Sequence, residues 1–149
     1  MTPEQIKLVQ ESFKSVEPIA AQAADLFYGR LFEIAPEVCP LFPADLTSQK
    51  AKLMSMIGTA VANLHQVEKI VPAVQDLGRR HATYGVKDTH YKPVGEALIW
   101  TLDKGLGSAF TQPVKDAWVA AYTTLAGVMT EAAASVKPAR KGLLARMFG

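Results

Sequence analysis

Two of the three histidines lie in a short stretch, residues 77–91, that holds most of the candidate chemistry of the chain. It places His81 four residues before Gly85 and His90 directly before Tyr91. A neutral imidazole is a good ligand for a transition metal. A histidine at the end of a helix, followed by a glycine break and a second helix, is well placed to hold one face of a metal cofactor. His81 is therefore the first candidate for a metal ligand.

The other histidines and the cysteine limit the kind of metal site. His65 lies 16 residues after Gln49, and on one continuous helix that is about 24 Å, too far to serve the same metal. We expect His65 to be a surface residue or a helix end, and His90 to be exposed. The single Cys39 excludes an intramolecular disulfide, a cysteine-based zinc site and a covalent Cys-x-x-Cys-His haem attachment.

Composition favours one globular domain. The chain has 149 residues, of which 49% are apolar, enough for a single core but not for two ordinary domains. The amino terminus does not resemble a signal peptide, and no run of 18 apolar residues is present. We therefore expect a cytoplasmic protein without a membrane span.

The charge is unevenly distributed. The formal charge is +2, but residues 137–149 hold Lys137, Arg140, Lys141 and Arg146 without an acid. Without these four positive charges, residues 1–136 carry a net charge of −2. This charge does not indicate nucleic-acid binding. We predict a domain over residues 1–136 and a basic tail over residues 137–149 that is disordered. An amphipathic tail that contacts an anionic membrane surface or a partner is the alternative.

Prolines mark where helices begin, because their fixed φ and missing N–H suit a first turn and harm a helix interior. Apolar residues recur at helical spacing between them, and no segment alternates with period two. The sequence therefore predicts an all-α fold of six main helices and one short turn. The first expected helix begins at about residue 3 and includes Ile6, Val9 and Phe13. The other expected segments are about 18–34, a turn at 36 to about 41, 47 or 48 to about 66, about 70 to just beyond 81, about 89–106, and 111 to about 134.

In order and spacing, Tyr28, Phe42, Gln49, His81 and Tyr91 give the chain a resemblance to the globin family. It looks most like bacterial single-domain globins and the haem domain of flavohaemoglobins, over about residues 4–132. The motifs that carry the likeness are Leu26-Phe-Tyr-Gly-Arg-Leu-Phe32, Pro40-Leu-Phe42 and Leu77-Gly-Arg-Arg-His-Ala-Thr-Tyr-Gly-Val86, followed by His90-Tyr91. The resemblance implies a globin fold enclosing one haem b (iron protoporphyrin IX), held non-covalently.

The resemblance also implies residue roles. His81 would be the proximal iron ligand, Phe42 would stack on the porphyrin, and Tyr28, Gln49 and Leu53 would form the distal pocket. Lys52 and Arg80 would pair with the haem propionates, with solvated charges as the equal alternative. The other residues that would contact the haem are Ile57, Leu77, Val86, Tyr91 and Val94. The alternative of ordinary core applies to Phe42, Leu53, Ile57, Leu77, Val86 and Val94. Trp118 and Tyr122 are expected in the core, with Tyr122 near the proximal side.

The sequence departs from flavohaemoglobins on the proximal side, where that family places a tyrosine and a glutamate around the histidine. Tyr91 matches the tyrosine. The place of the glutamate, 11 residues after Tyr122, holds Ala133, and Glu131 lies on a different face of the helix. Loss of this carboxylate would weaken the hydrogen bond that makes the histidine a stronger electron donor.

These features lead to three functional hypotheses. The first is a globin that reversibly binds dioxygen, nitric oxide or carbon monoxide as a carrier, store or sensor. Donors from Tyr28 and Gln49 would hold dioxygen more firmly than the less polar carbon monoxide. The second is a nitric oxide dioxygenase that depends on a separate reductase, since we expect no flavin domain after residue 149. The third is a haem-free globin-like signalling module.

Overall fold

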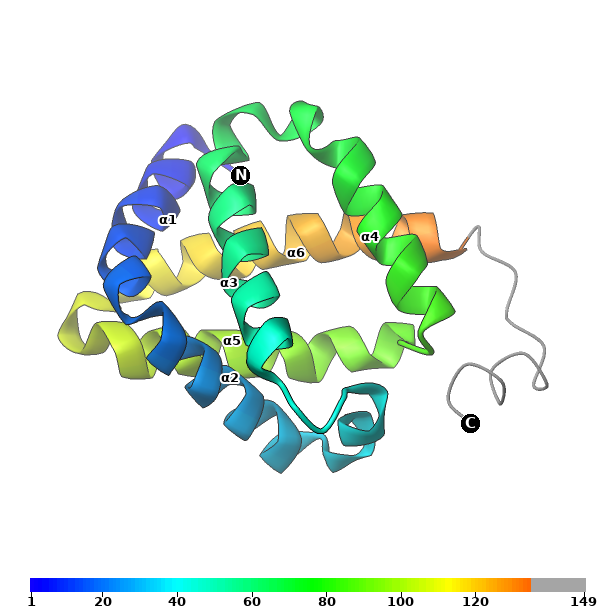
Figure 1. Cartoon of the computed structure of the whole chain (residues 1–149). Helices are drawn as coiled ribbons and strands as arrows, with labels where there is room; N and C mark the ends of the chain where they lie inside the picture. Colours follow the sequence, from blue (N-terminus) through cyan, green and yellow to red (C-terminus); the bar gives the residue numbers. More distant parts are fainter. Residues whose placement is uncertain (135–149) are drawn as a thin grey trace.

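The computed structural model describes residues 1–134, and within them it contains six α-helices and no strand (Figure 1). The predicted all-α fold is confirmed. A short 3-10 helix, η2 (Pro36–Leu41), forms the predicted turn. The α-helices are α1 (Pro3–Val16), α2 (Ala20–Ile34), α3 (Thr47–Ala62), α4 (Val71–Thr83), α5 (Tyr91–Leu106) and α6 (Gln112–Ala134). The predicted tail, residues 137–149, lies outside the described residues.

Local sequence signals explain most helix ends. Thr2 and Gln5 form a capping box at α1, in which each side chain accepts a hydrogen bond from the other residue's backbone N–H. Gly107, at φ 56°, ends α5 in a conformation that favours glycine. Single 3-10 turns that the periodicity does not reveal precede α2 at Glu17–Ile19 (η1) and α5 at Asp88–His90 (η4).

The third helix is shorter than predicted. It ends at Ala62, and His65 lies in a separate 3-10 segment, η3 (Leu64–Lys69). The Asn63 side chain donates to the Thr59 carbonyl at 2.8 Å, and Gln66 has the non-helical angles φ −143° and ψ 51°. Asparagine competes in this way with the backbone for hydrogen bonds at helix ends. The prediction of one helix from Gln49 to His65 is therefore wrong, although His65 is exposed as expected.

The core consists of two apolar clusters. The larger one joins α1, α2, α3, α5 and α6 around Phe13 and Trp118, whose rings lie 6.2 Å apart. Trp118 is 3% exposed, and its indole N–H donates to Ser12 Oγ at 2.9 Å. The smaller cluster is built from α2, η2 and α5 around Tyr28 and Leu31. Trp118 is thus a core residue, as predicted.

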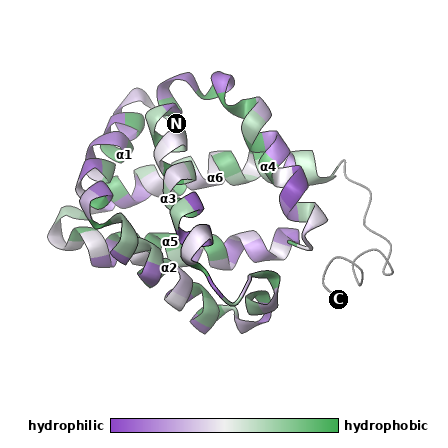
Figure 2. Ribbon diagram, in the orientation of Figure 1, coloured by the Kyte–Doolittle hydropathy of each residue, from purple (hydrophilic) through white to green (hydrophobic). Residues whose placement is uncertain are grey.

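Helix α4 stands apart from both clusters. It packs along α6, and Gly78 is the one residue of α4 that is buried. A Cβ atom at Gly78 would meet the backbone of Met129, so glycine lets the two helix backbones approach closely. Helix α4 does not pack closely on α2 or α3, and Figure 1 shows α3 and α4 as separate helices in front of α6. Figure 2 shows green apolar and purple polar residues alternating around α4. The apolar residues Val71, Val74 and Leu77 of α4 thus stay only half-buried.

Candidate functional site

His81 lies in the last turn of α4, where the backbone is held by a Schellman motif. The N–H of Val86 donates to the His81 carbonyl at 2.9 Å, and the N–H of Gly85 donates to the Ala82 carbonyl at 3.1 Å. Gly85 has φ 94°, which a residue with a side chain rarely adopts. The glycine break seen in the sequence therefore fixes the turn that carries His81 and places Val86 beside it.

The two ring nitrogens of His81 differ in their surroundings. Nδ1 is buried and has no hydrogen-bond partner among the described residues. Nε2 forms no hydrogen bond with this part of the chain and is not buried. Burial, and secondarily the positive charge of Arg80, lowers the pKa of His81 below its ordinary value of 6.5. A neutral imidazole with a free, accessible nitrogen is the form that binds a metal.

Tyr91 supplies a second buried polar atom without a partner. Its hydroxyl oxygen has no hydrogen bond among residues 1–134, and burial raises its pKa. Its backbone carbonyl accepts a hydrogen bond from the Tyr122 hydroxyl at 2.6 Å. Glycine at position 95 admits the Tyr122 ring, because a Cβ there would lie 2.7 Å from Tyr122 Cε2. Tyr122 therefore ties α6 to the start of α5 beside Tyr91.

The carboxylate expected in flavohaemoglobins is not supplied by Glu131, whose side chain is exposed. Ala133 lies one helical turn beyond Met129, the residue that contacts Gly78 of α4. His81 lies three residues beyond Gly78 on α4, and both helices end on the same side of the molecule (Figure 1). Ala133 is thus on the side of α6 near the His81 turn and carries no acid.

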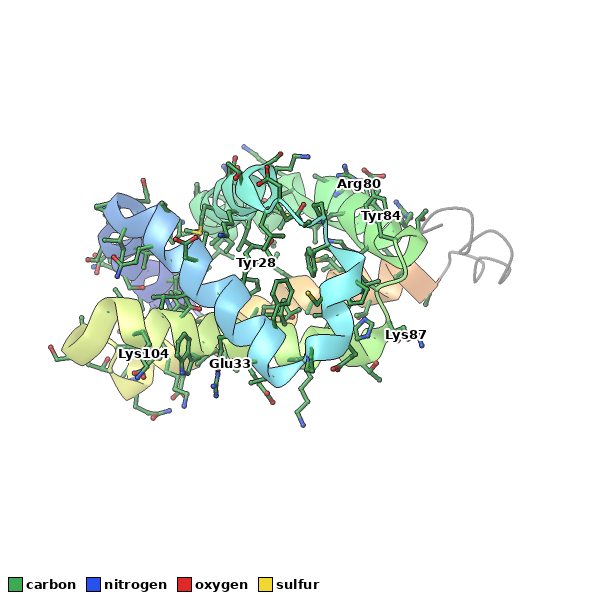
Figure 3. All side chains as sticks on the ribbon, turned by 60° about the horizontal axis from the view of Figure 1, so that its bottom comes forward. Tyr28, Glu33, Arg80, Tyr84, Lys87 and Lys104 are labelled. Carbon is green, nitrogen blue, oxygen red and sulfur yellow. The ribbon has the colours of Figure 1, made fainter. Side chains whose placement is uncertain are left out.

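Tyr28 is the centre of an aromatic cluster on the inner side of α2. It is 3% exposed, and its ring lies 5.1 Å from Phe27 and 5.5 Å from Phe42, both in edge-on contact. Phe32 lies 6.0 Å from Tyr28 and 5.6 Å from Phe42. Figure 3 shows Tyr28 inside the molecule, whereas Arg80 and Tyr84 lie at the outer edge of α4. Sequence reasoning left Phe32 without a role, although its spacing of four from Tyr28 places both on one helix face.

Gln49, in the first turn of α3, lies next to Tyr28. Burial raises the pKa of Tyr28, and a hydrogen bond with the Gln49 side chain opposes this rise. That direction is expected when the Gln49 amide donates to the phenol oxygen. The Tyr28 hydroxyl then keeps its own proton for a third group. The structure thus brings together the two polar residues that the sequence assigned to the distal pocket.

The apolar site residues come from several elements and are only half-buried. Phe42, Leu53 and Val94 pack against the Tyr28 cluster, and Ile57 packs against the larger core. Leu77 and Val86 belong to neither cluster and are also half-buried. Apolar side chains that stay half-buried on α3, α4 and α5 fit contact with a large apolar ligand.

The predicted propionate partners are at the surface. Lys52 is exposed. Arg80 Nε lies 3.3 Å from Asp76 Oδ2 one turn back on α4, with 59% of the Arg80 side chain exposed. His90 is partly exposed, and its Nδ1 accepts a hydrogen bond from the Lys87 N–H at 3.0 Å, so it caps η4. These contacts leave the propionate roles of Lys52 and Arg80 as predictions.

Other parts of the described chain offer no competing metal or membrane site. No group of three histidine, cysteine, aspartate or glutamate residues in residues 1–134 could hold a metal ion. In the same range, none of the helices combines the length and apolar character needed to cross a membrane. A groove of about 750 Å³ lies between α2, α5 and α6, and its lining includes Trp100, over which Arg30 stacks at 5.2 Å, but neither His81 nor Tyr28.

Comparisons with known proteins agree with this arrangement. The sequence model of the family described as Globin matches residues 25–129. A flavohemoprotein of Bacillus subtilis is 34% identical over 125 residues, which are 78% of this chain and 31% of that protein. The chain thus spans about a third of the length of this relative.

Two solved structures share the fold at 25% identity. A bacterial globin from Campylobacter jejuni superposes with a TM-score of 0.80, covering 89% of this chain and 96% of that one. An engineered carbene transferase, described provisionally as a nitric oxide dioxygenase from Rhodothermus marinus, superposes with a TM-score of 0.82, covering 90% of this chain and 94% of that one.

Proposed function

Since the chain belongs to the globin family, we propose that it holds haem b non-covalently and reversibly binds dioxygen and other diatomic gases as a carrier, store or sensor. The observation that carries this proposal concerns the side chains of α4. Its His81 forms no side-chain hydrogen bond among the described residues, and its apolar residues Val71, Val74 and Leu77 stay only half-buried although α4 packs along α6. These residues and His81 would hold haem, a largely apolar group that fits between α4 and α3.

The residues present fit this group. His81 would hold the iron through Nε2, with Leu77 and Val86 beside it on the proximal side. Phe42, Leu53, Ile57 and Val94 would supply the remaining apolar contacts. When bound, haem would supply an iron that binds a small gas.

On the distal side, Tyr28 and Gln49 would set the preference among gases. The Tyr28 hydroxyl lies beside the Gln49 side chain, and if it accepts from the Gln49 amide it would keep a proton to donate to the gas. A hydrogen-bond donor from Tyr28 would favour dioxygen over the less polar carbon monoxide. The distal pair therefore supports a protein that retains dioxygen.

The test is haem reconstitution of the full chain and of His81→Ala. We expect a Soret band for the parent chain and loss of tight haem binding for the variant. His65→Ala is the matched control, because His65 is exposed in η3, and it should bind haem as the parent does. Absence of a Soret band in the parent would refute the proposal and favour the haem-free signalling module. An unchanged spectrum in His81→Ala would refute the proximal role.

A nitric oxide dioxygenase is the second candidate, favoured by the likeness to a flavohemoprotein and to the Rhodothermus marinus protein. Nitric oxide, dioxygen and one electron combine to give nitrate, so turnover needs a reductant. We infer that a separate reductase would supply the electron. Position 133 holds alanine and Glu131 is exposed, which supports the carrier, because a carboxylate beside His81 would strengthen electron donation by the histidine.

Stopped-flow mixing of the oxygenated protein with nitric oxide distinguishes the two candidates. The carrier predicts at most one nitrate per protein and no sustained turnover when cell extract and NADH are added. Sustained nitrate production, with dioxygen consumed in equal amount, would instead establish the enzyme.

A further inference from the structure

One ion pair joins two helices next to the distal residues. Lys50 Nζ lies 2.8 Å from Asp25 Oδ1, with Asp25 on α2 and Lys50 in the first turn of α3. The other ion pairs in residues 1–134 each lie within a single helix, at a spacing of three or four residues. The pair between Asp25 and Lys50 is therefore a polar tie between α2 and the start of α3.

This tie lies beside both distal residues along the chain. Asp25 precedes Tyr28 by three residues, which is about one turn of α2. Lys50 directly follows Gln49. A displacement of the first turn of α3 relative to α2 would therefore change the contact between Gln49 and Tyr28.

Few other directional contacts hold the start of α3 on the rest of the protein. Leu46, the residue before the helix, makes no side-chain cap. Asp45 Oδ1 instead accepts from the Thr47 N–H at 3.0 Å and from Thr47 Oγ1 at 2.7 Å, in a turn that is internal to the corner. Leu46 and Leu53 contribute only apolar contacts to the Tyr28 cluster, and such contacts are not directional.

We infer that Asp25 and Lys50 are positioning residues that hold the first turn of α3 on α2 and so keep the Gln49 amide within reach of the Tyr28 hydroxyl. This inference rests on the proposed function. An ion pair with side chains 34% and 65% exposed adds little to stability. Its effect should appear in the residence time of a polar gas rather than in the melting temperature.

The test measures dioxygen and carbon monoxide dissociation from the haem-loaded full chain. Asp25→Asn and Lys50→Gln should each speed dioxygen dissociation about threefold, because the distal hydrogen bonds weaken, and leave carbon monoxide dissociation unchanged. The exchanged pair, Asp25→Lys with Lys50→Asp, should restore the parent rate. Glu33→Gln, which removes an ion pair within α2, is the matched control and should change neither rate.

A second measurement needs no haem. In the apoprotein, the nuclear Overhauser effect between the Tyr28 ring and the Gln49 amide protons should weaken in Asp25→Asn and persist in Glu33→Gln. An unchanged effect, or unchanged dioxygen rates, would overturn the inference. Equally faster dissociation of dioxygen and carbon monoxide would also overturn it, since that would mean a generally loosened pocket. Failure of the proposed function would appear separately, as a parent chain without a Soret band.

Discussion

The hydroxyl of Tyr28 is the group that should decide how long dioxygen stays bound. The ring is held by Phe27 and Phe42, so Tyr28→Phe should leave the packing intact and remove only a hydrogen bond. A hydrogen bond to a charged group contributes about 1.5–3 kcal/mol. We therefore expect dioxygen dissociation, measured by stopped flow, to become about tenfold faster or more.

Tyr84→Phe is the control for this change, because Tyr84 is 51% exposed and lies at the outer edge of α4 (Figure 3). The rate of dioxygen dissociation from Tyr84→Phe should match that of the parent chain. A dioxygen off-rate that does not change in Tyr28→Phe would place the Tyr28 hydroxyl outside the ligand pocket.

Ala133 offers a gain-of-function prediction on the proximal side. Ala133→Glu would put an acid near the unpartnered Nδ1 of His81 and the Tyr91 hydroxyl. A carboxylate that accepts from Nδ1 strengthens the bond between the histidine and iron. We expect a higher iron–histidine stretching frequency in the resonance Raman spectrum and faster reaction with peroxide.

The control for Ala133→Glu is Glu131→Gln, since Glu131 is exposed and its loss should change neither measurement. If Glu131→Gln lowered the stretching frequency, Glu131 would already act as the proximal carboxylate, and our reading of the sequence would be wrong.

At the level of single residues, sequence could predict the types and order of the site residues but not their contacts. Gly85 predicts the turn after His81, because residues with a side chain rarely adopt its positive φ. The contact between Gln49 and Tyr28 and the ion pair between Asp25 and Lys50 depend on how α3 crosses α2. That crossing is set by tertiary packing and leaves no local pattern in the sequence.

At the level of helices, the close approach of α4 to α6 should depend on Gly78. In Gly78→Ala the new Cβ would meet the carbonyl oxygen of Met129 and lie 2.7 Å from its Cα, and backbone cannot move aside as a flexible side chain can. Overpacking of this kind costs about 1–3 kcal/mol. We expect a lower free energy of unfolding in urea and weaker haem binding, because the His81 turn is displaced with α4.

Gly127→Ala is the matched control, since Gly127 also lies in a helix and a Cβ there would meet nothing within 4 Å. It should stabilise the protein by about 0.5–1 kcal/mol, as alanine is the better helix former. Equal stability of Gly78→Ala and the parent would mean that α4 can move away from α6 without cost.

Helix positions were largely predictable because proline and glycine act locally. Pro3, Pro72 and Pro113 each lie at the first or second position of a helix, and Gly107 ends α5. The end of α3 was predicted wrongly because apolar spacing continues through Leu64, while the Asn63 side chain and the kink at Gln66 interrupt the helix. Side-chain competition for backbone groups is a weak signal in a single sequence.

At the level of the whole molecule, the core is complete without α4. Both apolar clusters are formed by other elements, and α4 buries only Gly78. Regions with few buried apolar contacts open locally at low free energy. In the apoprotein, we therefore expect the amide hydrogens of α4 to exchange faster than those of α2 and α5.

Haem should then slow exchange in α4, because it would cover the apolar residues of α4 that stay half-buried in the apoprotein. Hydrogen exchange followed by mass spectrometry should show new protection in α4 and α3 on haem addition and little change in α1. A ligand that binds only the folded state adds about 2.7 kcal/mol of stability at a free concentration of 100 Kd, so the melting temperature should rise as well. In His81→Ala, haem should add neither protection from hydrogen exchange nor a higher melting temperature. Protection of α4 that is already equal to that of α2 without haem would contradict the inference that α4 depends on this ligand.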